Sequence, residues 1–187
     1  VGSAISSHPE IDMISFTGST RAGKAITKEA ADTIKRVTLE LGGKSPNLFF
    51  DDADIEKAVK VSVDACFINN GQSCDAASRL LVDRKVYDLV VEKVAEEVRS
   101  VQVGDPMVEG KHIGPVVNKI QFDNIQKLIE IGINEGANLV AGGLGLPQGM
   151  NKGYYIQPTL FADVRNEMEI AQNEVFGPVL SIIPFDT

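Results

Sequence analysis

The sequence lacks tryptophan and has only two cysteines in 187 residues. So few cysteines exclude the disulfide framework of a small secreted domain, and we expect a reducing compartment such as the cytoplasm. Long apolar runs are missing too, since none approaches the roughly 20 residues needed to cross a bilayer. The first residues do not show the basic-then-apolar order of a signal peptide. The sequence therefore predicts no membrane partner.

Positive charge is scarce relative to negative charge. The 18 Lys and Arg residues face 26 Asp and Glu residues, which gives a net charge of -8 at pH 7. This balance disfavours the phosphate-neutralising surface that sequence-independent nucleic-acid binding needs. Hydrophobic residues make up 43% and charged residues 24% of the chain, close to the averages for globular proteins. We expect no nucleic-acid partner and one folded domain, or one domain plus part of another.

Both ends of the sequence are abrupt. The chain opens on Val1 rather than methionine, and a strand-like apolar run follows at 11–16. A similar run at 179–185 stops two residues before the last residue. These edges are expected of a segment taken from a longer parent protein.

Strand-like and helix-like segments alternate along the sequence. One helix is expected at about 21–34, because Ala22, Ile26, Ala30 and Ile34 fall on one side of it. Strands are expected at 11–16, 37–41, 47–50, 80–82, 138–141 and 179–185. Further helices are expected at 55–66, with Asp54 as N-cap, and at 86–98 and 118–135. This alternation predicts an α/β fold with a mainly parallel sheet and flanking helices.

One stretch imitates the phosphate-binding loop of nucleotide triphosphatases. Gly18, Gly23 and Lys24 keep the spacing of that motif, but Ala25 stands where a hydroxyl must bind Mg²⁺. A phosphate-loop protein is therefore disfavoured. A helix start directly behind a strand still suits a phosphate or pyrophosphate. The alternative is that Gly18 only makes a tight turn.

An acidic cluster at Asp51, Asp52 and Asp54 raises the question of a metal site. The cluster lacks the regularly spaced oxygen ligands and the distal glutamate of a calcium loop. Helix capping and compensation of the helix dipole explain these acids. We therefore predict no metal site.

Four short motifs occur in order along the chain. They are FTGST at 16–20, LELGGKSP at 39–46, NGQSCDAASR at 70–79 and EVFGPV at 174–179. With these motifs the chain resembles the aldehyde dehydrogenase superfamily. The resemblance spans nearly the whole chain, yet it corresponds to well under half of a usual family member.

The resemblance implies a catalytic pair. Cys74 would be the nucleophile, which attacks the aldehyde, while its backbone N–H stabilises the resulting oxyanion. Hydride transfer to a nicotinamide cofactor would leave a thioester on Cys74. Glu40 would be the general base that activates water to release the acid. A branch of the family that transfers its product to coenzyme A typically lacks this glutamate, so the resemblance implies hydrolysis.

The resemblance also implies cofactor-binding roles for NAD or NADP. The implied residues are Gly18 and Ser19 at the pyrophosphate, Leu41 and Gly42 near the nicotinamide, and Glu174 and Phe176 at the nicotinamide ribose. The alternatives are a surface acid at Glu174 and core packing at Phe176. Cys66 differs from Cys74, because it falls on the apolar face of the helix expected at 55–66 and reads as a buried core residue.

Two other functions compete with this one. A cysteine protease or acyltransferase needs a histidine base, and only His8 and His112 exist. The residues next to Cys74 also match neither local protease signature. The more serious alternative is an inactive truncated module. The upstream half of the cofactor domain, an oxyanion-hole asparagine and the C-terminal segment of the family lie outside this chain.

The same resemblance implies the domain organisation. Residues 1–41 would form the C-terminal part of a Rossmann-like dinucleotide-binding domain, and residues 42–187 a catalytic domain truncated at its C-terminus. Catalytic residues would then meet at a domain cleft, a common place for ligand sites. The expected substrate is a small-molecule aldehyde, and the parent protein is expected to be a homo-oligomer.

Overall fold

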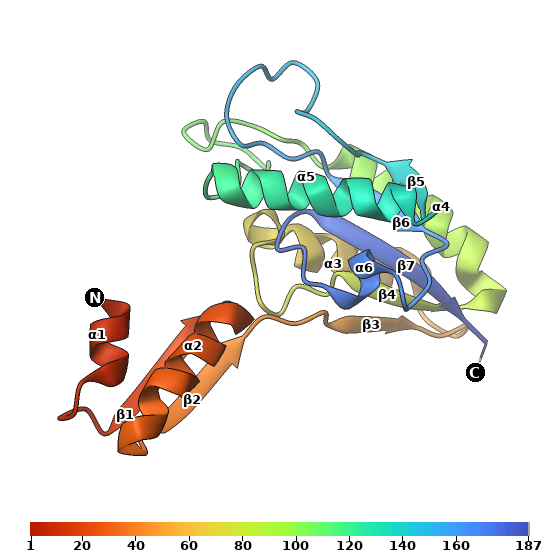
Figure 1. Cartoon of the computed structure of the whole chain (residues 1–187). Helices are drawn as coiled ribbons and strands as arrows, with labels where there is room; N and C mark the ends of the chain where they lie inside the picture. The colour runs from red at the N-terminus through yellow and green to blue at the C-terminus, as the bar shows by residue number, and fades with distance from the viewer. Residues whose placement is uncertain (187) are drawn as a thin grey trace. The chain divides into compact units, whose positions relative to one another are not determined.

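The computed structural model describes residues 1–186. The chain divides into two compact units, one of residues Val1–Gly43 and one that begins at Lys44. Helices and strands alternate in both units (Figure 1). The α/β fold predicted from the sequence is confirmed.

The first unit is built around two parallel strands and one helix. Strand β1 pairs with β2 in parallel, and α2 makes the connection between them. Its elements are α1 (Gly2–Ser7), β1 (Met13–Gly18), α2 (Thr20–Ala30), the 3-10 turn η1 (Ala31–Thr33) and β2 (Arg36–Leu41). Strand β1 starts two residues later than expected. Helix α1 was not expected at all.

Helix α2 begins and ends for identifiable reasons. The Ser19 side chain accepts a hydrogen bond from Ala22 N at 3.2 Å, which caps the first turn. The buried Gly23 lets the helix approach β2, since a Cβ there would lie 2.8 Å from the Leu41 side chain. The expectation that Ile34 continues the apolar face is wrong. Ile34 adopts a left-handed φ of 53° and is 92% exposed, because the helix has already ended.

The second unit contains a five-stranded sheet in the order β3-β4-β7-β6-β5. The strands are β3 (Pro46–Phe49), β4 (Arg79–Asp83), β5 (Asn138–Ala141), β6 (Thr159–Ala162) and β7 (Val179–Phe185). Three of the pairings are parallel and only the β5–β6 pairing is antiparallel. The prediction of a mainly parallel sheet is therefore confirmed. Strand β6 was not predicted.

Helices cover both faces of this sheet. They are α3 (Ile55–Phe67), α4 (Tyr87–Ser100), α5 (Lys119–Asn134) and α6 (Glu169–Gln172), with short 3-10 turns η2 (Ile68–Gly71) and η3 (Arg84–Val86). Alternate residues of β7 enter two different cores. Leu180 and Ile182 pack with α3 and α4, whereas Val179 and Ile183 pack with α5 and α6. The period of two along a strand produces this division.

Two details of α3 match the sequence analysis. The Asp54 side chain accepts a hydrogen bond from Lys57 N at 3.2 Å and so caps the helix, as predicted. Cys66 is fully buried on the apolar face, also as predicted.

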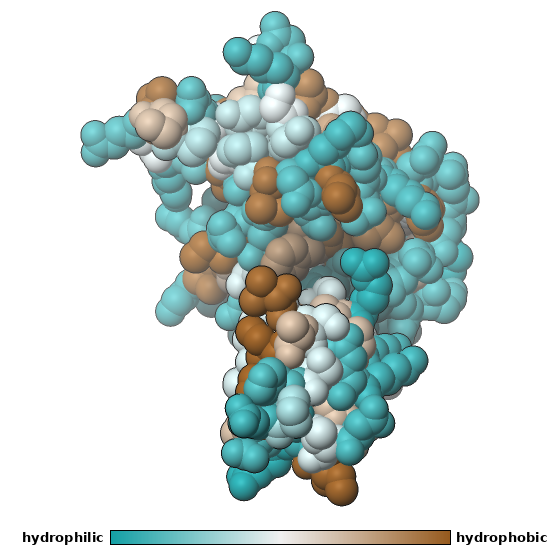
Figure 2. Space-filling view, turned by 60° about the vertical axis from the view of Figure 1, so that its left-hand side comes forward, coloured by the Kyte–Doolittle hydropathy of each residue, from teal (hydrophilic) through white to brown (hydrophobic). Residues whose placement is uncertain are grey.

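The surface of the described chain carries scattered apolar groups. On the face drawn in Figure 2, hydrophobic residues form small groups between larger hydrophilic areas. Within residues 1–186, none of the helices combines the length and the apolar content that crossing a membrane would require.

Candidate active site

The loop that carries Cys74 begins where α3 ends. Three consecutive residues, Asn69, Asn70 and Gly71, adopt left-handed backbone angles with φ of 51°, 60° and 71°. Asparagine and glycine are the residues that tolerate this conformation best. The chain thereby reverses sharply and presents Cys74 in an exposed turn.

Side-chain hydrogen bonds hold this turn in place. The Asn69 amide donates to the Gln72 carbonyl at 2.9 Å, and the Gln72 amide donates back to the Asn69 carbonyl at 3.2 Å. The loop is also tied to the segment before α5. Gln72 Oε1 accepts from Val117 N at 2.9 Å, and Asn70 Nδ2 donates to the Pro115 carbonyl at 3.0 Å.

The Cys74 loop packs directly against the loop of the fourth motif. A Cβ on Gly71 would lie 2.2 Å from the Gly177 carbonyl oxygen, so the two backbones are in contact. Next to this contact, Phe176 takes a left-handed φ of 52°. Gln121 on α5 donates from Nε2 to the carbonyls of Val175 and Phe176 at 3.1 and 2.8 Å. The fold therefore brings the Cys74 and Glu174–Phe176 motifs together.

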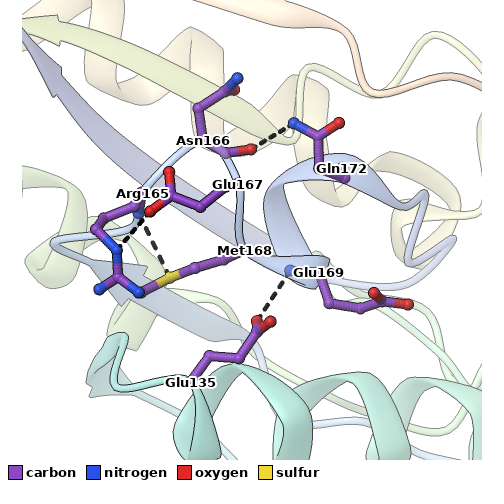
Figure 3. Close-up of polar contacts among 7 residues, drawn as sticks. All are labelled: Glu135, Arg165, Asn166, Glu167, Met168, Glu169 and Gln172. Atoms are coloured by element: carbon purple, nitrogen blue, oxygen red, sulfur yellow. Dashed lines mark hydrogen bonds and ion pairs between the residues drawn. The ribbon is translucent and has the colours of Figure 1, made fainter.

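The segment that leads into Glu174 is fixed by its own polar contacts (Figure 3). Glu169 N donates to Glu135 Oε2 at 2.9 Å, which attaches the start of α6 to the end of α5. The Gln172 amide donates to the Asn166 carbonyl. These contacts set the direction in which the chain enters the Glu174 loop.

Lys44 is a buried basic group whose pKa is influenced by Glu174. The Lys44 Nζ is shielded from solvent and has no hydrogen-bond partner among the described residues. Burial lowers the pKa of Lys44 to about 8, Cys66 and Glu174 raise it, and Arg79 lowers it further. Arg79 Nη2 donates to the Lys44 carbonyl at 3.0 Å. Lys44 belongs to the LELGGKSP motif, but the sequence alone predicts no role for it.

The two cysteines differ sharply. Cys66 is fully buried, and burial raises the pKa of its thiol to about 12 although Lys44 opposes the shift. Its Sγ donates weakly to the Val179 carbonyl at 3.9 Å. A reactive cysteine must be accessible and able to form a thiolate. Cys74 is exposed, so it is the better candidate for chemistry.

The first unit gathers the other candidate residues at one end of its sheet. The parallel register pairs Gly18 with Leu41 and Thr17 with Glu40. Ser19 then caps α2, and Gly42 follows β2 directly. Glu40, Gly18, Ser19, Leu41 and Gly42 therefore belong to the first unit, whereas Cys74, Glu174 and Phe176 belong to the second.

The start of α2 in the first unit has the backbone features of an anion site. The first turn of a helix leaves backbone N–H groups without intrahelical acceptors and carries the positive end of the helix dipole. Gly18 stands directly before this turn with no side chain of its own, and a Cβ there would lie 2.6 Å from the Phe16 ring. Such an arrangement can hold an anion. In residues 1–186, no group of three or more His, Cys, Asp or Glu residues could hold a metal ion.

Comparison with known proteins gives a consistent result. The model of the aldehyde dehydrogenase family matches residues 1–187. An aldehyde dehydrogenase structure from Bartonella henselae is 56% identical, with a TM-score of 0.97 over 100% of this chain and 39% of that one. Aldehyde dehydrogenase C from Pseudomonas syringae, in a mutant complex with NAD⁺ and octanal, is 48% identical with a TM-score of 0.97, covering 100% and 38%.

A curated relative extends the comparison. The 3-succinoylsemialdehyde-pyridine dehydrogenase of a Pseudomonas species is 49% identical over 185 residues, which cover 99% of this chain and 39% of the relative. The chain thus spans about 39% of the length of the curated relatives it matches. The match of the family model from the first residue to the last settles the classification. The chain belongs to the aldehyde dehydrogenase family.

Proposed function

We propose that the complete protein containing this chain oxidises an aldehyde to a carboxylic acid with NAD or NADP. Complete protein here means the longest natural reading frame that encodes the chain. The observation that carries the proposal is the exposed Cys74 on a loop held in backbone contact with the Glu174–Phe176 loop. Family membership supports it.

Cys74 performs the first half of the reaction. Its thiolate attacks the aldehyde carbon, and the carbonyl oxygen becomes the oxyanion of a thiohemiacetal. The backbone N–H of Cys74 donates to this oxyanion. The nicotinamide cofactor, when bound, supplies the acceptor for the hydride that leaves the same carbon. Loss of the hydride re-forms the carbonyl and leaves a thioester on the Cys74 sulfur.

Glu40 performs the second half. Its carboxylate takes a proton from water while the water oxygen attacks the thioester carbon. The carbon–sulfur bond breaks, the carboxylic acid leaves, and the Cys74 thiolate is restored. This role requires the Glu40 carboxylate to reach a water molecule beside Cys74. A general base at Glu40 favours hydrolysis of the thioester over transfer of the acyl group to coenzyme A.

The remaining candidate residues hold the cofactor. Gly18 and Ser19 bind the pyrophosphate at the start of α2, where backbone N–H groups point outward. Leu41 and Gly42 offer backbone groups near the nicotinamide. The Glu174 carboxylate accepts hydrogen bonds from the nicotinamide ribose, and Phe176 packs against that sugar. The strained φ of 52° at Phe176 supports a functional role for this loop.

The domain assignment follows the same scheme. Residues 1–41 are the end of the dinucleotide-binding domain, and residues 42–187 belong to the catalytic domain. The division of the chain into compact units after Gly43 supports a boundary near this point. The complete protein is a homo-oligomer.

The substrate is a small-molecule aldehyde. The structure of aldehyde dehydrogenase C from Pseudomonas syringae contains octanal. The curated Pseudomonas relative is named for 3-succinoylsemialdehyde-pyridine. The aldehydes named for these two relatives therefore differ. A panel of acetaldehyde, octanal and an aromatic aldehyde, tested with NAD⁺ and NADP⁺, defines the preference of the complete protein.

The assignment of the catalytic residues is tested by substitution in the complete protein. Cys74→Ser and Glu40→Gln should each lower kcat by about a hundredfold or more, because nucleophile and base act in successive steps. Cys66→Ser is the matched control for the loss of a thiol. Aldehyde oxidation that survives both Cys74→Ser and Glu40→Gln would overturn the assignment.

An inactive module is the second candidate function for the chain alone. The chain spans only about 39% of the length of its curated relatives, so we infer no turnover by the purified 187-residue chain. Steady NAD⁺-dependent oxidation of acetaldehyde by that chain would contradict this inference.

A further inference from the structure

Cys74 lies at the second position of a tight turn. The Ala76 N–H donates to the Ser73 carbonyl at 3.2 Å, which closes a β-turn around the cysteine. The peptide bond between Ser73 and Cys74 is trans, so its N–H points away from its carbonyl. Because that carbonyl faces Ala76, the Cys74 N–H faces out of the turn. No backbone carbonyl among residues 1–186 accepts from this N–H, which can therefore donate to a bound oxyanion.

Gln72, which directly precedes this turn, is held through all of its polar groups. Its backbone N–H and its Nε2 both donate to the Asn69 carbonyl, at 3.1 and 3.2 Å. Its carbonyl accepts from Asn69 Nδ2 at 2.9 Å, and its Oε1 accepts from Val117 N at 2.9 Å. The backbone and the side chain of Gln72 are therefore fixed together, one residue before the turn begins.

The Gln72 side chain reaches a segment that is held independently of the turn. Its partner there is the N–H of Val117. Val116, the residue before this partner, is buried, and its N–H donates to the Tyr154 carbonyl at 2.9 Å. Asn118, the residue after the partner, is the side-chain N-cap of α5. Gln72 thus connects the Cys74 turn to a segment that is anchored on both sides.

We propose that Gln72 is a positioning residue for the Cys74 N–H, which it keeps directed toward the oxyanion formed during aldehyde oxidation. This role rests on the oxyanion donation proposed above for the same N–H. A donor of this kind acts only at hydrogen-bond distance from the developing charge, and a displacement of about 1 Å can cost about a hundredfold in rate. Gln72 need not touch the aldehyde or the cofactor to have this effect.

The main test is Gln72→Met in the complete protein, which removes both side-chain hydrogen bonds at nearly constant length. The kcat for aldehyde oxidation should fall about tenfold or more, whereas KM for the aldehyde and for the cofactor should stay within about threefold. The matched control is Gln126→Met. Gln126 also accepts a backbone N–H through Oε1, but from Gly145 rather than from the segment that Gln72 contacts. A fall in kcat for Gln72→Met no larger than that for Gln126→Met would overturn the proposal.

Alkylation of Cys74 by iodoacetamide separates the orientation of its N–H from a general disturbance of the loop. The displacement of iodide consumes the thiolate but forms no oxyanion, so it does not need the Cys74 N–H as a donor. In Gln72→Met the alkylation rate, followed by mass spectrometry of the Cys74 peptide, should stay within about threefold of that in the unchanged protein. An alkylation rate that falls as much as kcat would overturn the assignment to the N–H.

Asn69→Gly tests the same support if Gln72→Met fails to fold. Glycine readily adopts the φ of 51° found at Asn69, and the substitution removes the hydrogen bond from Nδ2 to the Gln72 carbonyl. The kcat of the complete protein should fall about fivefold or more, with KM values within about threefold. An unchanged kcat in this variant would contradict the positioning role.

Cys74→Ser separates this inference from the function on which it rests. If Cys74→Ser abolishes aldehyde oxidation and Gln72→Met leaves kcat unchanged, the positioning role is wrong and Cys74 stands as the nucleophile. If Cys74→Ser leaves aldehyde oxidation intact, the proposed function fails, and the role of Gln72 fails with it.

Discussion

Gly71 and Gly177 bring two distant motifs into backbone contact. A Cβ at Gly71 would lie 2.2 Å from the Gly177 carbonyl oxygen, and Gly71 has a φ of 71°. Gly71→Ala should therefore destabilise the protein by about 3 kcal/mol, from overpacking and backbone strain together. Activity of the complete protein should fall at least about tenfold, because the Cys74 loop shifts. Urea denaturation and kcat/KM measure the two effects.

Gly136→Ala is the control for that substitution. Gly136 also has a positive φ of 84°, but nothing lies within 4 Å of the position its Cβ would take. Gly136→Ala should lower the free energy of unfolding by only about 1 kcal/mol, because of backbone strain. Equal losses at the two glycines would show that the contact with Gly177 is energetically unimportant.

Gln121 supports the Glu174–Phe176 loop from α5. Gln121→Leu removes both hydrogen bonds to the Val175 and Phe176 carbonyls and should raise KM for the cofactor about fivefold or more. Steady-state kinetics of the complete protein measure this change. The control is Gln126→Leu on the same helix, since Gln126 accepts from Gly145 N instead. Equal KM values in the two variants would refute the supporting role.

Cys66 should make stability fall at alkaline pH. Its pKa is about 12 in the folded chain against 9.0 in a reference state, so above pH 9 only the unfolded chain releases the proton. The unfolded state then binds fewer protons, and stability decreases as pH rises from 9 toward 12. Cys66→Ala removes this loss. The stability advantage of the unchanged protein over Cys66→Ala should shrink by about 2 kcal/mol between about pH 8.5 and 10.5.

Urea denaturation at several pH values measures that difference. Lys44 also titrates in this range, but with the opposite sign. Burial lowers its pKa to about 8, so below pH 8 the charged Lys44 destabilises the folded chain. This destabilisation decreases as pH rises and Lys44 becomes neutral. Lys44 is present in both proteins, but Cys66 raises its pKa, so the comparison removes only the part of the Lys44 contribution that does not depend on Cys66. A stability difference that is constant with pH would contradict the buried state of Cys66.

Asp54 should contribute to stability as a helix cap. Asp54→Ala removes the acceptor for Lys57 N and should cost about 1 kcal/mol, whereas Asp54→Asn should cost much less. Asp52→Ala, an exposed neighbour outside the helix, should change stability little. Thermal unfolding of the three variants provides the measurement. A loss at Asp52 as large as that at Asp54 would contradict the capping role.

The sequence predicted features that depend on local chemistry. Asp54 as N-cap, the burial of Cys66 and the extent of β7 follow from residue type and periodicity, and the structure agrees. Strand β6 was missed because all four of its residues are buried, so it shows no alternation. Ile34 was misplaced because nothing in its immediate sequence marks the end of α2.

Contacts between residues far apart in the chain could not be predicted from the sequence. The motifs around Cys74 and Glu174 were recognised, but the contact between Gly71 and Gly177 depends on how separate loops pack. The burial of the Lys44 Nζ likewise depends on how segments distant along the chain pack around it. A single sequence shows neither.

A covalent intermediate at Cys74 is the central feature of the proposed function. Glu40→Gln in the complete protein should form the thioester but fail to hydrolyse it. Mixing this variant with octanal and NAD⁺ or NADP⁺, followed by mass spectrometry of its peptides, should reveal the octanoyl group on the peptide that contains Cys74. Turnover at the unchanged rate, or an acyl group on Cys66 instead of Cys74, would contradict the account.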